Sequence, residues 1–137
     1  MFRVFLLLLV LTVLGTAVMA TSFAPPQSYP VGVGSAFFCS ADFDGDGDID
    51  LAVRHHDDDF FPALDPNAGI SILLNNGNGT FEPAVEYVTG DVIMSICAID
   101  VDGDGDIDLA STEDVYTTEF SLDSLSIWIN DGSGVVH

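Results

Sequence analysis

Apolar residues form one long run at the start of the chain and short runs separated by Gly, Asn and Asp after it. Short apolar runs bounded by such residues are typical of β-strands. The pattern predicts strands over 36–41, 49–53, 70–74 and 81–88, with Ile49, Leu51 and Val53 on one face of the second strand. Residues 75–79 (NNGNG) predict a turn. No window of helical length keeps a period of 3.6 without Gly or a β-branched run, so we expect an all-β chain.

Much of the chain consists of two copies of one unit. At an offset of 58 residues, DFDGDGDIDLA (42–52) aligns with DVDGDGDIDLA (100–110), and Cys39 aligns with Cys97. A second block, ISILLNNGNG (70–79), aligns with LSIWINDGSG (125–134) at an offset of 55. Four short strands per unit, joined by Gly- and Asn-rich turns, are the pattern of a β-propeller blade. We therefore predict an all-β fold of four-stranded antiparallel blades, about one and a half of them, forming part of a propeller.

The first apolar run predicts a secretory signal peptide. Arg3 precedes residues 4–14, which are apolar apart from Thr12, and Val18 and Ala20 supply the small residues of a cleavage site. We expect residues 1–20 to be the signal peptide, 21–28 a linker, 29–86 the first repeat and 87–137 a second, truncated repeat. An uncleaved membrane anchor is the alternative, and the run is short for a span. We expect a secreted, extracellular or cell-surface location, with the periplasm as a further compartment.

Charge restricts the partners of the chain. The formal net charge is −20, with 22 Asp and Glu against 2 Lys and Arg. Loss of Arg3 with the leader, which holds no acids, makes it −21 and leaves Arg54 as the last basic side chain apart from His. Such a chain does not bind nucleic acid or an anionic membrane by electrostatics. The charge instead indicates bound cations, although a general adaptation to high salt gives the same composition.

Two aspartate-rich loops carry the chemistry. In the loop of residues 42–50, carboxylates stand at positions 1, 3, 5 and 9, and Gly47 at position 6 permits a sharp turn. Calcium takes six to eight oxygen ligands in a flexible shell, whereas magnesium keeps a smaller octahedral one. We expect Asp42, Asp44, Asp46 and Asp50 to bind Ca²⁺ through side chains and Asp48 through its carbonyl. The second loop repeats this with Asp100, Asp102, Asp104, Asp108 and, through its carbonyl, Asp106. An ordinary acidic turn is the alternative for each loop.

The residues after each loop exclude two other calcium motifs. Position 12, where an EF-hand has Glu, is Val53 in one loop and Ser111 in the other. The residues that leave each loop alternate as a strand does, whereas EF-hands and dockerin modules continue into a helix.

The motifs DFDGDGDIDLAV and SILLNNGNGTF, followed by DVDGDGDIDLA, resemble the FG-GAP/VCBS repeats, which also form the calcium-binding blades of integrin α-subunit propellers. The resemblance covers residues 29–137. It implies a β-propeller blade with one Ca²⁺ in the loop between its first two strands, two ions in total, and a role in adhesion. A propeller closes with about four to eight blades. Because the chain has fewer than two complete repeats, we expect it to be a fragment of a longer protein. Assembly from several copies and a degenerate relic are the alternatives.

Two weaker signals have an ordinary interpretation that we prefer. RHHDDD (54–59) fits either a second metal site or a polar surface loop. Cys39 and Cys97 lie three residues before their loops, where a disulfide between neighbouring inner strands competes with two small buried apolar side chains. We favour the loop and the unbridged thiols.

No catalytic constellation accompanies these loops, so we expect a binding module and not an enzyme. The module would hold structural Ca²⁺ and bind an extracellular protein or carbohydrate, and its open blade edges would allow self-association. The alternative is an N-terminal fragment or accessory propeller of a secreted hydrolase or lyase whose catalytic part lies outside this chain.

Overall fold

The computed structural model describes residues 23–35, 37–56, 67–116 and 121–134 of the chain. The expected signal peptide lies outside these residues. Within them every regular element is a β-strand, and no helix of a length and apolarity suited to crossing a bilayer is found. The strands are β1 (Phe37–Ala41), β2 (Asp50–His55), β3 (Gly69–Leu73), β4 (Val85–Val88), β5 (Val92–Ile99), β6 (Asp108–Tyr116) and β7 (Ser121–Trp128).

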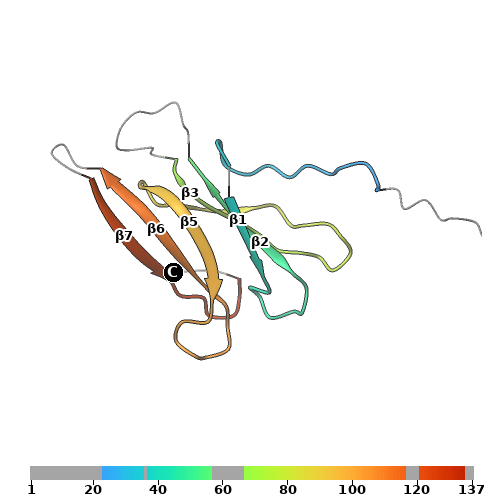
Figure 1. Ribbon diagram of the computed structural model, residues 1–137. Helices are drawn as coiled ribbons and strands as arrows, with labels where there is room; N and C mark the ends of the chain where they lie inside the picture. The colour runs from blue at the N-terminus through green and yellow to red at the C-terminus, as the bar shows by residue number, and fades with distance from the viewer. Residues whose placement is uncertain (1–22, 36, 57–66, 117–120, 135–137) are drawn as a thin grey trace, which may run out of the picture.

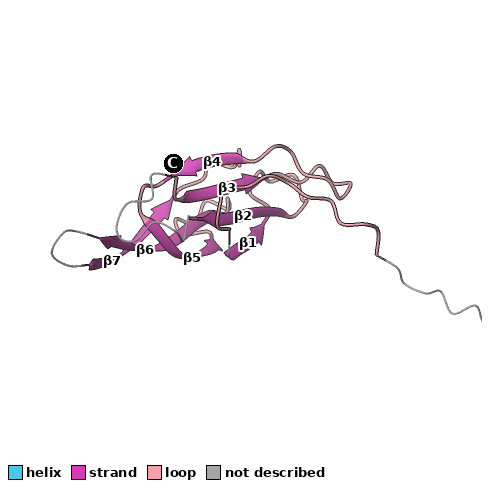
Figure 2. Cartoon of the chain, turned by 90° about the horizontal axis from the view of Figure 1, so that it is seen from above, coloured by secondary structure: helices cyan, strands magenta, loops and turns pink. Residues whose placement is uncertain are grey.

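The strands form two open antiparallel sheets, so the predicted all-β, blade-type fold is confirmed. The first sheet has the order β1-β2-β3-β4 and the second has the order β5-β6-β7. Within each sheet, each strand pairs with the strands that are next to it in the sequence. β5 lies against β1 and β2, so the second sheet packs on the first (Figures 1 and 2).

The fourth predicted strand is shorter than the sequence indicates. We predict it over 81–88, but β4 begins at Val85. Phe81 makes only an isolated bridge to Asn75. Pro83 lies between the bridge and the strand, and a proline has no amide hydrogen to donate to a ladder. The bridge instead closes the turn that follows β3.

The buried face of β2 is the polar one. Ile49, Leu51 and Val53 share a face, as predicted, but Ile49 is 54% exposed. The alternating positions Asp50, Ala52 and Arg54 are buried. This face meets the second sheet, and the apolar core between the sheets is made of Phe43, Ala52, Ile70, Ile72, Ile93 and Leu109. The core therefore depends on both repeats, because its side chains come from both sheets.

Arg54 joins the two sheets. Its guanidinium Nη1 donates a hydrogen bond of 2.6 Å to the carbonyl oxygen of Ile93, at the start of the second sheet. Its Cζ lies 5.1 Å from the ring centre of Phe37, a cation–π distance. The surface loop predicted for residues 54–59 is thus wrong for Arg54 and His55, which are buried at the end of β2. Residues 57–59 lie outside the described part of the chain.

His55 is buried because the chain before β1 folds back over β2. No room for a side chain exists at Gly32, since a Cβ there would overlap the His55 ring. The Gly32 amide donates to Ser71 Oγ at 3.4 Å, and Tyr29 packs edge-on against Phe81. Residues 29–34 therefore cover the β3 side of the outer face of the first sheet.

Candidate metal centre

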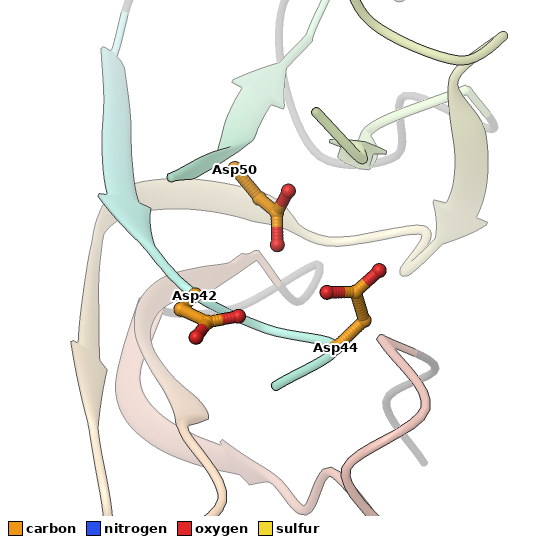
Figure 3. A group of neighbouring side chains, drawn as sticks. All are labelled: Asp42, Asp44 and Asp50. Carbon is orange, nitrogen blue, oxygen red and sulfur yellow. The ribbon is translucent and has the colours of Figure 1, made fainter. Parts of the chain in front are cut away.

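Each aspartate-rich loop connects the first two strands of its sheet. In the first loop, Asp42 follows β1, Asp44 lies two residues further on, and Asp50 begins β2. One carboxylate oxygen from each of the three lies within 4.8 Å of the others. Figure 3 shows their carboxylates turned toward one space. Asp100, Asp102 and Asp108 form the same group in the second loop.

Hydrogen bonds from the backbone hold the loops in this curled form. The Gly47 amide donates to Asp42 Oδ2 at 3.0 Å, and the Gly105 amide donates to Asp100 Oδ2 at 3.2 Å. These two glycines have φ of 94° and 100°, a conformation that side-chain-bearing residues rarely adopt. Gly at position 6 is therefore needed to bring the middle of the loop back to its first aspartate.

The last aspartate of each loop is fully buried and joins two segments. Asp50 Oδ2 accepts from the Phe43 amide at 2.8 Å, and Asp50 Oδ1 accepts from the Asn75 amide at 2.7 Å. Asp108 accepts in the same way from the amides of Val101 and Asn130 at 2.9 Å each. A charged acceptor at this position ties the loop to the turn after the third strand.

The structure does not place the other predicted ligands in these groups. Asp46 Oδ1 accepts from the Asp48 amide at 2.8 Å, and Asp104 Oδ1 accepts from the Asp106 amide at 2.9 Å. The carboxylates of Asp48 and Asp106 lie beside Gly77 and Gly132, in the turns after the third strands. Each turn therefore needs a glycine where the loop's seventh residue approaches it.

Two asparagines that are not among the predicted site residues support the loops. The side-chain Nδ2 of Asn75 donates to the Ile49 carbonyl oxygen at 3.0 Å, and Asn130 Nδ2 donates to the Ile107 carbonyl oxygen at 3.0 Å. Asn130 Nδ2 also donates to the Phe43 carbonyl oxygen at 2.6 Å, across the two sheets. Their signal was present, because both occupy the same position in the second repeated block.

The two loops differ in their surroundings. Gly134 of the second repeat lies against Asp44 and Leu74, so the second turn covers the first loop. Accordingly Asp42 and Asp44 are partly buried, whereas Asp100 and Asp102 are exposed. Burial raises the pKa of Asp44, and the neighbouring carboxylates of Asp46, Asp50 and Asp42 raise it further, against a lowering by the Asp46 amide. In the second loop the pKa of Asp106 is raised in the same way, by burial and by neighbouring carboxylates, so both loops carry a cost for their negative charge.

Cys39 and Cys97 are unbridged and differ in exposure. Cys39 on β1 is half-buried and Cys97 on β5 is exposed, so only Cys39 fits the expectation of a buried thiol. Burial, with a smaller contribution from the Cys97 charge, raises the pKa of Cys39 from its ordinary 9.0 to about 11.

We expect Cys97 to react with iodoacetamide at pH 8 at least about tenfold faster than Cys39. With a pKa of about 11, Cys39 has about a hundredfold less thiolate at pH 8 than a thiol at its ordinary 9.0, and the higher nucleophilicity of a more basic thiolate offsets about half of that on a logarithmic scale. Cys97 is also the more exposed of the two thiols. Peptide mass spectrometry over time measures both rates, and the Cys39 rate should keep rising between pH 8 and pH 10. Equal rates, or no labelling of either thiol before reduction, would contradict this prediction.

One segment of the chain matches a known protein family. Residues 54–111 match the family described as FG-GAP-like repeat. No curated protein and no solved structure matches the chain. The matched segment runs from the end of β2, through β3, β4 and β5, to the second aspartate loop and the beginning of β6. Residues 54–111 of this chain are therefore similar to an FG-GAP-like repeat.

Proposed function

We propose that the chain is a calcium-stabilised binding module in which each aspartate loop holds one structural Ca²⁺. The observation that carries the proposal is the group of three carboxylates within 4.8 Å, found at the same place in both repeats. Like charges at such separations repel, and a divalent cation converts the repulsion into attraction. The FG-GAP-like match supports a repeat module of propeller type.

The first loop fits a calcium ion in its donor chemistry. All its donors are hard oxygens, and Asp42 Oδ1 is a buried carboxylate oxygen without a hydrogen-bond partner among the described residues. Such an oxygen is costly unless a cation or water meets it. Asp42, Asp44 and Asp50 would hold the ion in the first loop, and Asp100, Asp102 and Asp108 in the second. The remaining loop aspartates would complete the shell through carbonyl oxygens, side chains or bound water.

The ion would supply charge compensation and loop closure rather than a reaction. Asp50 already ties the loop to the turn after β3, so an ion on its carboxylate would stabilise both. We propose a binding role, and no enzymatic one, with an extracellular protein or carbohydrate as the ligand. The apolar leader pattern and a net charge of −20 support a secreted or surface location, where calcium is abundant.

Adding a chelator is expected to lower the melting temperature by about 3–11 °C. Extracellular modules bind Ca²⁺ at about 10⁻⁴–10⁻³ M. At about 1 mM calcium each site then contributes about 0.4–1.4 kcal/mol, and about 1 kcal/mol shifts the melting temperature of a domain this size by about 4 °C. Scanning calorimetry with Ca²⁺ or EGTA measures the shift, and Mg²⁺ at the same ionic strength is the control. An unchanged melting temperature together with no calcium binding in titration calorimetry would overturn the proposal.

The two loops should contribute unequally. The second turn covers the first loop and holds its Phe43 carbonyl, so that loop is better organised before the ion arrives. We expect Asp42→Ala to remove more of the calcium-dependent gain in melting temperature than the matched variant Asp100→Ala. Each variant should bind one Ca²⁺ in titration calorimetry where the parent binds two. Equal losses from the two variants would contradict the difference between the loops.

A further inference from the structure

The face of the second sheet that points away from the first sheet is open and apolar. We call it the open face and define it by Met94 and Cys97 of β5 with Leu125 and Ile127 of β7. Their pairing through β6 places Cys97, Ala110 and Ile127 in one row across this face. Met94 is 54%, Leu125 67% and Ile127 41% exposed. Three such large side chains together form the kind of surface that a partner covers.

The repeat identifies what covers such a face. At the offset of 55, Leu125 and Ile127 correspond to Ile70 and Ile72, which are 0% and 1% exposed. Those two residues are covered by the second sheet, whose Ile96, Leu109 and Trp128 pack into the same core. The same positions are therefore buried in the first repeat, where the second sheet packs on them, and exposed in the second.

The first sheet also has an exposed surface that corresponds to the covering residues of the second sheet. At the offset of 58, the covering residues Ile96 and Leu109 correspond to Phe38 and Leu51 of the first sheet. Phe38 is 69% exposed and Leu51 is partly exposed. We call Phe38, Leu51 and Val53 the docking face. Residues 29–34 contact His55 and Ser71 beside it, and they leave Phe38 accessible.

A hydrogen bond between the repeats also has a donor and an acceptor whose counterparts are available for a second copy. Asn130 Nδ2 donates both to the Ile107 carbonyl of its own loop and to the Phe43 carbonyl of the other loop. Its counterpart Asn75 makes the first of these bonds, to Ile49. The counterpart of Phe43 is Val101, whose side chain is 45% exposed. A docked copy could thus repeat the second bond, from its Asn75 to the Val101 carbonyl.

We propose that a second copy of this chain docks its docking face on the open face, repeating between chains the packing that joins the two repeats within one. The interface is head-to-tail, because the two faces lie on different sheets. A head-to-tail interface closes into a ring or continues as an open fibre. Two repeats per chain and about four to eight blades per propeller predict a ring of about two to four copies.

The charge of the chain dictates the conditions of the test. Copies that each carry about −20 repel, so association is expected to strengthen as salt rises. In about 1 M sodium chloride the screening length is about 3 Å. Light scattering on the eluting protein, recovered from an exporting host, should then show a mass of two or more copies that grows with concentration. A single-chain mass at every concentration, with calcium as well as with EGTA, would overturn the proposal.

Complementary variants distinguish this interface from unspecific association. Phe38→Asp removes the docking face and keeps the open face, whereas Leu125→Asp does the reverse. Each alone should be a monomer, and an equal mixture should give a dimer, because one competent interface remains between unlike chains. Association of either variant alone, or a mixture that stays monomeric, would overturn the proposal.

Two controls test whether the effects of these variants are specific and whether the variants fold. Phe23→Asp, at a fully exposed position on the segment before β1, should associate as the parent does. Urea unfolding of each variant tests folding, and Phe38→Ser with Leu125→Ser replaces the aspartate pair if either of those unfolds. Association through the apolar residues 4–14 would not respond to substitutions at Phe38 or Leu125. Association that persists in every variant would therefore overturn the docking proposal.

Discussion

Phe43→Ala is expected to lower the free energy of unfolding by about 3–5 kcal/mol. Phe43 is 1% exposed, the largest fully buried side chain among the described residues, and lies in the core between the sheets. Its removal leaves a cavity that neither sheet can fill alone. Because the free energy of unfolding of a domain is about 5–15 kcal/mol, this one substitution removes a large part of it. Urea unfolding followed by circular dichroism measures the shift in midpoint.

The second repeat supplies a matched control for this prediction. Val101 holds the same loop position as Phe43 but is 45% exposed, because no further sheet packs there. Val101→Ala should therefore cost less than about 1 kcal/mol. A similar loss from both substitutions would mean that the second sheet does not cover the first loop. Such a result would contradict the packing of the second sheet on the first.

Asp50→Ala is expected to lower the free energy of unfolding by about 2–6 kcal/mol in the presence of EGTA. The substitution removes the acceptor of the buried Phe43 amide and of the part-buried Asn75 amide. Each buried donor left without an acceptor costs about 1–3 kcal/mol. The loss of one negative charge near Asp42 and Asp44 offsets a part of this cost. Because the chelator removes any bound ion, the measurement isolates the hydrogen bonds.

Two further substitutions define the origin of the loss. Asp46→Ala removes a carboxylate from the same loop, but its single amide partner is exposed, so the expected cost is below about 1 kcal/mol. Asp50→Asn keeps the shape and one acceptor oxygen, and it should fall between the parent and Asp50→Ala. If Asp46→Ala and Asp50→Ala destabilise equally, Asp50 does not have the structural role assigned to it.

Much of the local structure follows from the sequence. The strands of the first repeat were predicted to within a few residues except for β4, where Pro83 shortens the ladder. Gly47 and Gly105 fix the register of the loops, because their backbone conformation is open mainly to glycine. Spacing alone indicated the carboxylates that meet, Asp42 with Asp44 and Asp50. It did not separate them from Asp46, whose carboxylate is not part of this group.

The sequence by itself determined the repeat, the all-β fold and the positions of the two acidic loops, because these depend on local periodicity and turn chemistry. Only the tertiary structure decided which faces are buried. The polar face of β2 turns inward because the second sheet packs there and gives Arg54 a carbonyl partner. Packing also made the two loops unequal, since the turn after β7 covers the first loop. Closely similar local sequences thus acquire different surroundings, which no local pattern encodes.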